Sequence, residues 1–531
     1  MPNTSTWSSF SSSLYSDPEL GLAVDVSRMG LTPDFRQQSA GRMQAAFGAM
    51  DRLEAGDIAN ADEKRMVGHY WLRAAQRAPT GLVKKINDTI ASVESFASEI
   101  LESGRFDHLL LVGIGGSMLG PQFLAQALRH TAKPKALRFH FIDNTDTDGV
   151  DQALGELEGQ LDRTLVVVTS KSGGTPETRN GMVEVAAAYK AAGLSFADHA
   201  VAITELFDRP EDYRALQRRA VDEHWMRCFP MYNWVGGRTS VFSAVGLLPL
   251  ALLGVDIRGF LAGAARMDDD TRRHVVAENP AALLTLSWLS AGRGVGDRAM
   301  VVLPYSDRLA LFAKYLQQLV MESLGKELDR KGNVVHQGLA VYGNKGSTDQ
   351  HSYIQQLRDG PDDYFAVFVE VLERSRPGGK VVEVEPGVTS DDYLQAFLLG
   401  TRQALTEKGH LSTTITLDRV TPASVGALIA LYERAVGLYA EMVDINAYHQ
   451  PGVEAGKKAA AQVLTLQQGI LKYLRSTAPA AATVEDIAKA VNAPENAETV
   501  YFILRRLAAD PARKVRGTNV SRPQTARFAA T

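Results

Sequence analysis

The amino-acid sequence predicts an α/β protein with two doubly wound parallel sheets, surrounding helices and a small C-terminal helical extension. Short apolar runs alternate with longer helical segments between residues 108 and 440, which is typical of βαβ units. The runs are continuously apolar rather than alternating, as expected for parallel strands covered on both faces. A length of 531 residues, 45% hydrophobic and 22% charged, favours a globular chain of about three to four domains.

Residues 1–100 are predicted to form an N-terminal helical segment, because Ala, Met and Leu recur between acid–base pairs at 35–54 and 61–77. The Ser-rich start has no basic residue before Arg28 and no apolar stretch, unlike a secretory signal or a transit peptide. No apolar run approaches the roughly 18 residues that a membrane-spanning helix needs. A soluble cytoplasmic protein with no membrane partner is therefore expected.

Two α/β domains are predicted, at residues 101–275 and 276–440. Strands of the first domain are expected at 108–112, 138–142, 165–168 and 200–203. Strands of the second are expected at 299–303, 364–371 and 413–417, with helices at 307–323, 391–405 and 423–439. A C-terminal helical segment is expected at 441–476. Residues 477–531 are predicted to be an Ala/Pro linker followed by a small helical tail with a loose end.

Composition narrows the classes of partner and cofactor. The net charge is −4, which gives no reason to expect nucleic acid as a partner of the whole chain. Cys228 is the single cysteine, so an intrachain disulfide and a cysteine-based metal site are both excluded. Residues 483–531 carry eight Lys or Arg and five Asp or Glu. This mild excess favours a docking appendage over a nucleic-acid surface.

The strongest local signal for a binding site is a loop that follows an apolar strand and leads into a helix. It consists of Ser170, Lys171, Ser172, Gly173, Gly174 and Thr175. Thr175 can cap the helix, with Pro176 at its first position. The hydroxyls, the lysine and the N–H groups of the helix start supply the donors that a phosphate monoester needs. The alternative is an ordinary capped helix, and the pattern of a nucleoside-triphosphate loop is absent.

Two further glycine-containing turns are weaker signals. Gly116 and Ser117 belong to a strand-to-helix turn in which glycines let the backbone approach a ligand, although a tight turn explains them equally well. The dinucleotide fingerprint is not present there. Arg238 follows two glycines and can be held rigidly against an anion, although such a pattern is more often a surface turn.

Three ionisable residues are not distinguished by their local pattern. Glu322 falls off the apolar stripe of the helix predicted at 307–323, so periodicity predicts a solvent-facing glutamate. His351 lies in a polar turn and Lys457 on a helix, where structural or solvated side chains are the usual explanation.

Taken together, seven segments resemble the glucose-6-phosphate isomerase (phosphoglucose isomerase) family. They are VGIGGSMLGP, FIDNTD, TSKSGGTPET, VGGRTS, VMESLGK, GNKGSTDQHSYIQQLRDG and QPGVEAGK, and they span roughly residues 110–460 in the family's order. GSTDQH and SKSGGTPET together with MESLGK are highly specific, whereas GIGGS alone is not. Many members carry a bulkier pair at the positions of Gly173 and Gly174, so the chain is similar to a bacterial subtype. The chain also continues beyond residue 477, near which family members usually end.

The resemblance implies two sugar-isomerase (SIS) domains and a homodimer with active sites at the subunit boundary. It implies interconversion of glucose 6-phosphate and fructose 6-phosphate with no metal and no cofactor. Proton abstraction α to a carbonyl needs a positioned carboxylate, and the enediolate needs a fixed positive charge. The resemblance assigns these roles to Glu322 and Arg238. It implies ring opening by Lys457 and by His351 of the neighbouring subunit, which Glu177 orients. The implied substrate contacts are Gly116, Ser117, the 170–175 loop, Gln318 and Gln450.

Two other functions stay open. One is a dual phosphoglucose/phosphomannose isomerase, because selectivity for one hydroxyl's handedness depends on pocket shape. The other is a non-catalytic SIS module that senses sugar phosphates. A sensor would combine an intact phosphate loop with an incomplete catalytic set, and the presence of Glu322, His351, Arg238 and Lys457 disfavours it.

Overall fold

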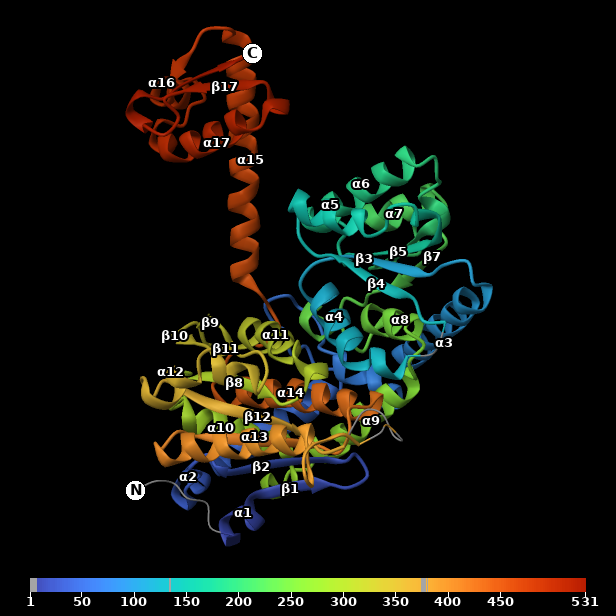
Figure 1. Cartoon of the computed structure of the whole chain (residues 1–531), viewed down its shortest axis with the longest axis vertical. Helices are drawn as coiled ribbons and strands as arrows, with labels where there is room; N and C mark the ends of the chain where they lie inside the picture. Colours follow the sequence, from blue (N-terminus) through green and yellow to red (C-terminus); the bar gives the residue numbers. More distant parts are fainter. Residues whose placement is uncertain (1–6, 133–134, 374–378, 380) are drawn as a thin grey trace. The chain divides into compact units, whose positions relative to one another are not determined.

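The computed structural model of the chain describes residues 7–132, 135–373, 379 and 381–531. The chain divides into two compact units, Met1–His449 and Gln450–Thr531. Figure 1 labels most of the elements of each unit. Among the residues that the structure describes, no helix has the length and apolar character needed to cross a membrane.

The first unit contains a five-stranded parallel sheet with the order β4-β3-β5-β6-β7. Its strands are β3 (His108–Val112), β4 (Arg138–Ile142), β5 (Thr164–Thr169), β6 (Ala200–Thr204) and β7 (Arg227–Pro230). Figure 1 shows α5 (Thr147–Gly155), α6 (Pro176–Ala191) and α7 (Ala215–Asp222) on one face of this sheet. The other face is covered by α3 (Thr80–Ser103), α4 (Gly116–Leu128) and α8 (Ala244–Leu252). The sheet is therefore doubly wound, and its strand order reverses direction between β3 and β5.

The same unit contains a six-stranded sheet with the order β1-β2-β15-β12-β8-β11. The parallel strands are β8 (Ala299–Pro304), β11 (Val341–Tyr342), β12 (Tyr364–Val371) and β15 (Ser412–Leu417). The principal helices here are α2 (Pro33–Glu54), α9 (Ile257–Thr271), α10 (Pro280–Ala291), α13 (Ser390–Glu407) and α14 (Pro422–Met442). These parallel strands wind in the same order as the first sheet, so the predicted fold class of two doubly wound sheets is confirmed.

The expected N-terminal helical segment is only partly helical. Residues Leu14–Asp17 and Leu22–Arg28 form β1 and β2, an antiparallel pair whose second strand joins the second sheet beside β15. Leu22, Val24 and Val26 are buried along β2 at the spacing of two residues that places side chains on one face of a strand. This alternation over a short segment was a strand signal that the sequence interpretation did not use.

The two sheets share one hydrophobic core. Leu109 and Leu111 of β3 face this shared core, together with Phe365, Val367 and Val369 of β12. The alternate residues of each strand face separate clusters on the outer side of their sheet. Because successive side chains point to opposite faces, every central strand is buried on both sides. The two predicted α/β domains are therefore packed against each other as one body.

A buried ionic cluster lies between α2, α9, α14 and the short helix η1 (His69–Arg73). The Arg73 guanidinium contacts Asp268 (Nε–Oδ2, 2.6 Å) and Glu433, and Arg434 contacts Glu54 (Nη1–Oε1, 2.6 Å). Burial opposes ionisation of Asp268, but Arg73 and Arg434 outweigh it and lower the pKa of this carboxyl to about 2. The charges are thus paired where unpaired ones would be very costly.

The second unit differs from the predicted helical tail with a loose end. Its elements are α15 (Pro451–Thr477), β16 (Ala482–Thr483), α16 (Val484–Ala490), α17 (Ala497–Ala509), β17 (Val515–Thr518) and β18 (Arg527–Ala530). The strands form an antiparallel sheet with the order β16-β18-β17. The segment expected to be loose provides the central strand, because Phe528 and Ala530 are buried against the helices of the unit. The extension is therefore a small α+β unit rather than a helical one.

Candidate active site

Two of the predicted glycine-containing turns meet at the switch point of the first sheet. β3 and β5 are parallel neighbours, so the turns that follow them lie at the same edge. A Cβ atom added to Gly113, directly after β3, would lie 3.3 Å from the carbonyl oxygen of Thr169 at the end of β5. Crevices at the carboxyl end of a doubly wound sheet, where the strand order reverses, are the usual place of ligand binding in such folds.

The 170–175 loop is organised by its own hydroxyl groups. The N–H of Gly173 donates to Ser170 Oγ (3.1 Å), and the Ser170 hydroxyl donates to Thr175 Oγ1 (3.3 Å). Thr175 stands at the N-cap position of α6, as predicted, but its side chain makes no capping hydrogen bond. Gly173 has φ +68°, and a Cβ there would lie 2.4 Å from the backbone nitrogen of Leu216, so only glycine fits. The loop therefore presents hydroxyls at the start of a helix, where an anion is favoured.

The Lys171 side chain extends from the 170–175 loop to the segment before Arg238. Its ammonium donates to the carbonyl oxygens of Asn233 (3.0 Å) and Val235 (2.9 Å). Burial lowers the pKa of this lysine to about 8. Lys171 thus connects the 170–175 loop to the segment that leads into Arg238.

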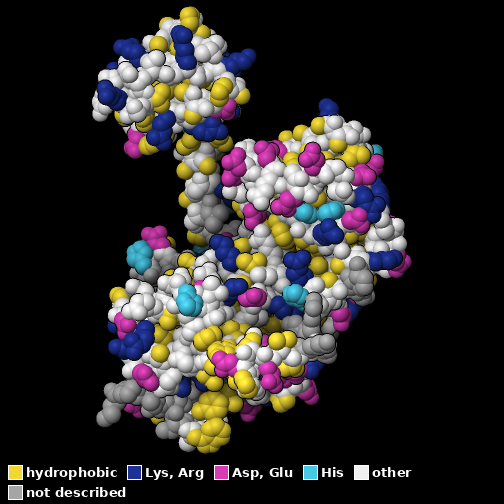
Figure 2. All heavy atoms as spheres, viewed as in Figure 1, with side chains coloured by type: hydrophobic (Ala, Val, Ile, Leu, Met, Phe, Trp, Pro, Cys, Tyr) yellow, Lys and Arg dark blue, Asp and Glu magenta, His cyan; other side chains and the backbone are white. Residues whose placement is uncertain are grey.

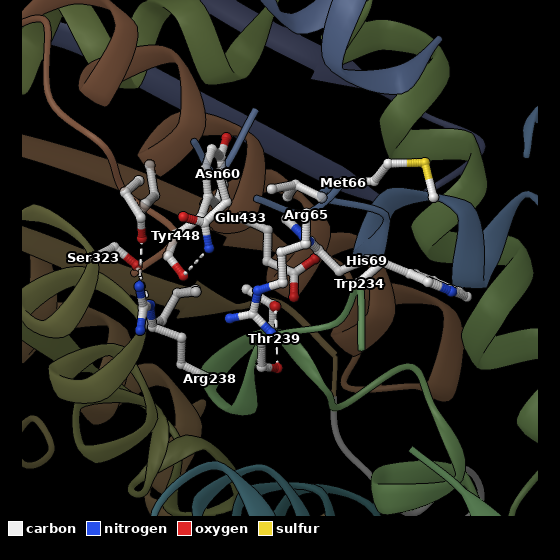
Figure 3. Close-up of a pocket in the computed structure, with 15 residues that line it drawn as sticks. Asn60, Arg65, Met66, His69, Trp234, Arg238, Thr239, Ser323, Glu433 and Tyr448 are labelled. Carbon is white, nitrogen blue, oxygen red and sulfur yellow. Dashed lines mark hydrogen bonds between the residues drawn. The ribbon is translucent and has the colours of Figure 1, made fainter. Parts of the chain in front are cut away.

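Arg238 is a buried residue rather than part of a surface turn. Its Nε donates to Ser323 Oγ (2.8 Å), and its Nη2 donates to the backbone carbonyls of His449 (3.2 Å) and Ala447. Figure 3 shows the guanidinium beside Ser323. Nη1 lies 3.3 Å from Glu322 Oε1. Burial lowers the pKa of Arg238 and Glu322 opposes that shift, yet a guanidinium remains charged because its ordinary pKa is so high. The arginine is therefore a fixed cation.

Glu322 faces the interior, so the prediction of a solvent-facing side chain is wrong. Its side chain is 18% exposed, and Oε2 is buried with no hydrogen-bond partner among the described residues. The helix predicted at 307–323 is interrupted: α11 (Phe312–Leu316) continues as a π-helix at Gln317–Glu322. A π-helix pairs residues five apart instead of four, so a stripe counted at 3.6 residues per turn misplaces Glu322. The carboxylate is instead turned toward Arg238.

Close approaches at two glycines bring three segments together. A Cβ on Gly115 would lie 3.1 Å from Gln318 Nε2, and a Cβ on Gly116 would lie 1.9 Å from the carbonyl oxygen of Gly237. The turn after β3, the π-helix and the segment carrying Arg238 are thus neighbours. Ser117 occupies the first turn of α4 in the same place. These residues and the 170–175 loop line one region of the first unit.

The remaining predicted residues lie in three segments. Glu177 is in the first turn of α6, and its Oε2 is buried with no hydrogen-bond partner in the described part of the chain. His351 ends the short helix Thr348–His351 and is exposed. Gln450 and Lys457 belong to the second unit, at the start of α15.

Several residues beside the site were missed by the sequence interpretation. The buried Lys326 donates to the backbone carbonyl of Glu322 (2.8 Å), and burial lowers its pKa to about 8. Lys326 and Ser323 both lie in VMESLGK, so that segment contained their signal. A pocket beside Arg238 is lined by residues from distant segments, including Asn60, His69 and Tyr448 (Figure 3). No local pattern indicated these three.

The doubly wound fold, with a hydroxyl-rich loop at the switch point and a carboxylate against a buried arginine, matches what is expected of the class of sugar-phosphate isomerases that the sequence resembles. A model of the phosphoglucose isomerase family matches residues 39–386 and 388–477. The glucose-6-phosphate isomerase of Synechococcus sp. (strain JA-3-3Ab) is 55% identical over 518 residues, 96% of each chain. The chloroplastic glucose-6-phosphate isomerase 1 of Arabidopsis thaliana is 53% identical over 98% of this chain and 86% of that protein.

The solved structures agree with this result. The crystal structure of a glucose-6-phosphate isomerase from Chlamydia trachomatis D/UW-3/Cx superposes with a TM-score of 0.79 at 26% identity, over 87% of this chain and 92% of that chain. The chain belongs to the phosphoglucose isomerase family.

Proposed function

We propose that this chain interconverts glucose 6-phosphate and fructose 6-phosphate through the site at the carboxyl edge of the first sheet. The observation that carries the assignment is the pairing of Glu322 with Arg238, 3.3 Å apart and both largely removed from water. An aldose–ketose isomerisation moves a proton between C1 and C2 and passes through an enediolate. A carboxylate with a buried lone pair can accept that proton, and a cation beside it can stabilise the enediolate oxygen.

The phosphate of the substrate binds, in this proposal, to the 170–175 loop. Its hydroxyls and the first N–H groups of α6 donate to the phosphate oxygens, with Gly116, Ser117 and Gln318 contacting the sugar. This places the binding energy at the end of the substrate that does not react, where it orients C1 and C2 against Glu322. The guanidinium of Arg238 is already held by Ser323 and by backbone carbonyls, so no reorganisation is needed when negative charge develops.

We assign opening of the sugar ring to His351 and Lys457. We propose a homodimer in which His351 of one subunit serves the site of the other, with Lys457 near the ring oxygen and Gln450 as a nearby contact. Two observations support this assignment of His351: the side chain is exposed, and Glu177 has a buried oxygen that lacks a donor among the described residues. An unpaired buried acceptor is costly, and an imidazole N–H would satisfy it.

We also propose that the protein is located in the cytoplasm. The single cysteine is compatible with this reducing compartment.

The Glu322→Gln substitution tests the assignment of the base. The amide keeps the shape of the side chain but cannot accept the proton, so turnover in a coupled assay with fructose 6-phosphate should be lost. Binding of fructose 6-phosphate, measured as the rise in melting temperature, should stay near that of the wild type. Glu99→Gln, an exposed glutamate on α3, is the matched control and should leave turnover unchanged.

Two outcomes would contradict the proposal. If Glu322→Gln kept about a tenth or more of the wild-type kcat, a loss of about 1.4 kcal/mol or less, Glu322 would not be the base. If the wild type bound fructose 6-phosphate without turning it over, the chain would be a sugar-phosphate sensor.

A further inference from the structure

The second unit, Gln450–Thr531, has a charge opposite in sign to that of the whole chain. It contains twelve Lys or Arg and six Asp or Glu, a net charge of +6, whereas the chain as a whole carries −4. The match to the phosphoglucose isomerase family ends at residue 477, so it assigns no role to α16, α17 and their sheet. A charge asymmetry of this kind between parts of one chain suggests contact with nucleic acid or with a membrane surface, and the fold of the unit distinguishes between them.

The order of elements in this unit is that of a winged helix-turn-helix. The C-terminal part of α15 is followed by β16, then by α16 and α17, and finally by the hairpin β17–β18, with β18 between the other two strands. α16 and α17 are connected by residues 491–496 and pack through Ile487, Ala488, Ile503 and Leu504. In a helix-turn-helix, the second helix enters the major groove of DNA. Here that helix is α17.

The two faces of α17 differ sharply. Val500, Ile503, Leu504 and Leu507 are buried against the unit, at the spacing of one helix face. The opposite face exposes Phe502, Arg505 and Arg506. The guanidinium of Arg505 lies over the Phe502 ring, 5.0 Å from its centroid. Arginine contacts guanine, and phenylalanine contacts the thymine methyl group, so this face carries side chains that distinguish base edges.

The hairpin adds further cations next to α17. Five exposed basic residues lie in and before the hairpin, namely Arg513, Lys514, Arg516, Arg522 and Arg527. None of the five forms an ion pair with an acid among the described residues. Asp510 is the single acidic residue between 499 and 531. Figure 2 shows more Lys and Arg than Asp and Glu on the visible face of this unit.

We propose that the second unit binds double-stranded DNA, with α17 in the major groove and the β17–β18 hairpin along the adjacent phosphates. DNA fits these observations better than duplex RNA does, because the major groove of A-form RNA is too deep and narrow to admit a helix. DNA also fits better than an acidic polypeptide, because exposed cations lie on both the helix and the hairpin, as phosphate contacts on either side of a groove require.

The test is fluorescence anisotropy of the full-length chain with a labelled DNA duplex of about 20 base pairs, roughly two helical turns. If about five cations contact phosphates, log K should fall with log salt concentration at a slope of about −4.5, a loss of about 500-fold between about 50 and about 200 mM. The variant Arg513→Gln/Arg522→Gln/Arg527→Gln should reduce the magnitude of that slope by about 3.

A matched control removes the same charge elsewhere. Lys84, Arg209 and Lys331 are exposed in the first unit, so Lys84→Gln/Arg209→Gln/Lys331→Gln should leave the slope unchanged. Circular dichroism and isomerase turnover check that both variants are folded.

A competition experiment on the wild-type protein tests the proposal without any variant. Unlabelled DNA duplex should displace the probe, whereas an RNA duplex and polyglutamate should not. Equal displacement by the RNA duplex would overturn the placement of α17 in the major groove. The proposal itself would be overturned by any of three results. These are equal displacement by polyglutamate, equal salt-dependence slopes for the two variants, and no binding of the DNA duplex at low salt.

Discussion

The contact between Gly116 and Gly237 predicts a large effect of one added methyl group. Gly116 is the first residue of α4, and its backbone φ lies outside the left-handed region. Helix propensity alone predicts that Gly116→Ala stabilises the protein by up to about 1 kcal/mol. The close approach predicts the opposite, because the new Cβ would lie 1.9 Å from the Gly237 carbonyl oxygen and 2.8 Å from the Arg238 nitrogen.

The size of the effect follows from how far the added Cβ lies inside the contact distance to the Gly237 carbonyl oxygen. Ordinary contact begins near 3.4 Å, so the methyl group needs about 1.5 Å more, the difference between 3.4 and 1.9 Å. The atom in its way belongs to the backbone and cannot rotate aside, so α4 and the segment carrying Arg238 must separate. Overpacking of this kind costs about 1–3 kcal/mol of stability. Misplacing a catalytic group by about 1 Å lowers the rate about 10²-fold.

The assay is kcat/KM for fructose 6-phosphate, measured by coupling glucose 6-phosphate to its dehydrogenase, together with urea unfolding. Gly116→Ala should lower kcat/KM by about 10²-fold or more. Gly149→Ala is the matched control, because Gly149 also lies in the first turn of a helix, α5, and a Cβ there meets nothing within 4 Å. That variant should keep kcat/KM and gain up to about 1 kcal/mol of stability.

The reasoning would be refuted if Gly116→Ala kept kcat/KM within about threefold of the wild type, a loss below 1 kcal/mol. In that case the turn after β3 would not control the position of Arg238.

Two further predictions concern Lys171 and Asp268. Lys171→Met removes the donor to the Val235 carbonyl, so urea unfolding should show a loss of about 1–3 kcal/mol. Its kcat/KM should fall as well, and an unchanged value would show that this contact does not position Arg238. Because the pKa of Asp268 is lowered to about 2, its stabilising effect is complete above about pH 4. Unfolding free energy should fall by about 2 kcal/mol between pH 4 and pH 2, and Asp268→Asn should lose most of that slope while being less stable throughout.

The strands and the glycine-containing turns could be predicted because their signals are local. A continuously apolar run such as 108–112 or 165–168 has few alternatives to a buried parallel strand. The hydroxyls and glycines after β5 indicate a turn that accepts an anion, whatever surrounds it. These features depend on neighbouring residues in the chain, so one sequence is enough to find them.

The inward orientation of Glu322 could not be predicted, because it depends on a π-helix that the 3.6-residue period does not describe. The role of Lys171 depends on Asn233 and Val235, some sixty residues away. The strand at 527–530 is four residues long and gains its stability from the sheet around it. In each case a contact distant in sequence overrides the local preference.

The shared core also has a mechanical consequence. Glu322 follows a strand of one sheet and Arg238 follows the last strand of the other, so the proposed base and its cation are carried by the two sheets that share this core. A rotation that opened a gap between the sheets would expose apolar surface at a cost of about 25 cal/mol for each Å². The packing of the first unit is therefore expected to keep the distance between Glu322 and Arg238 constant. Substrate entry and product release are therefore expected to involve loops and side chains rather than a rotation of one sheet against the other.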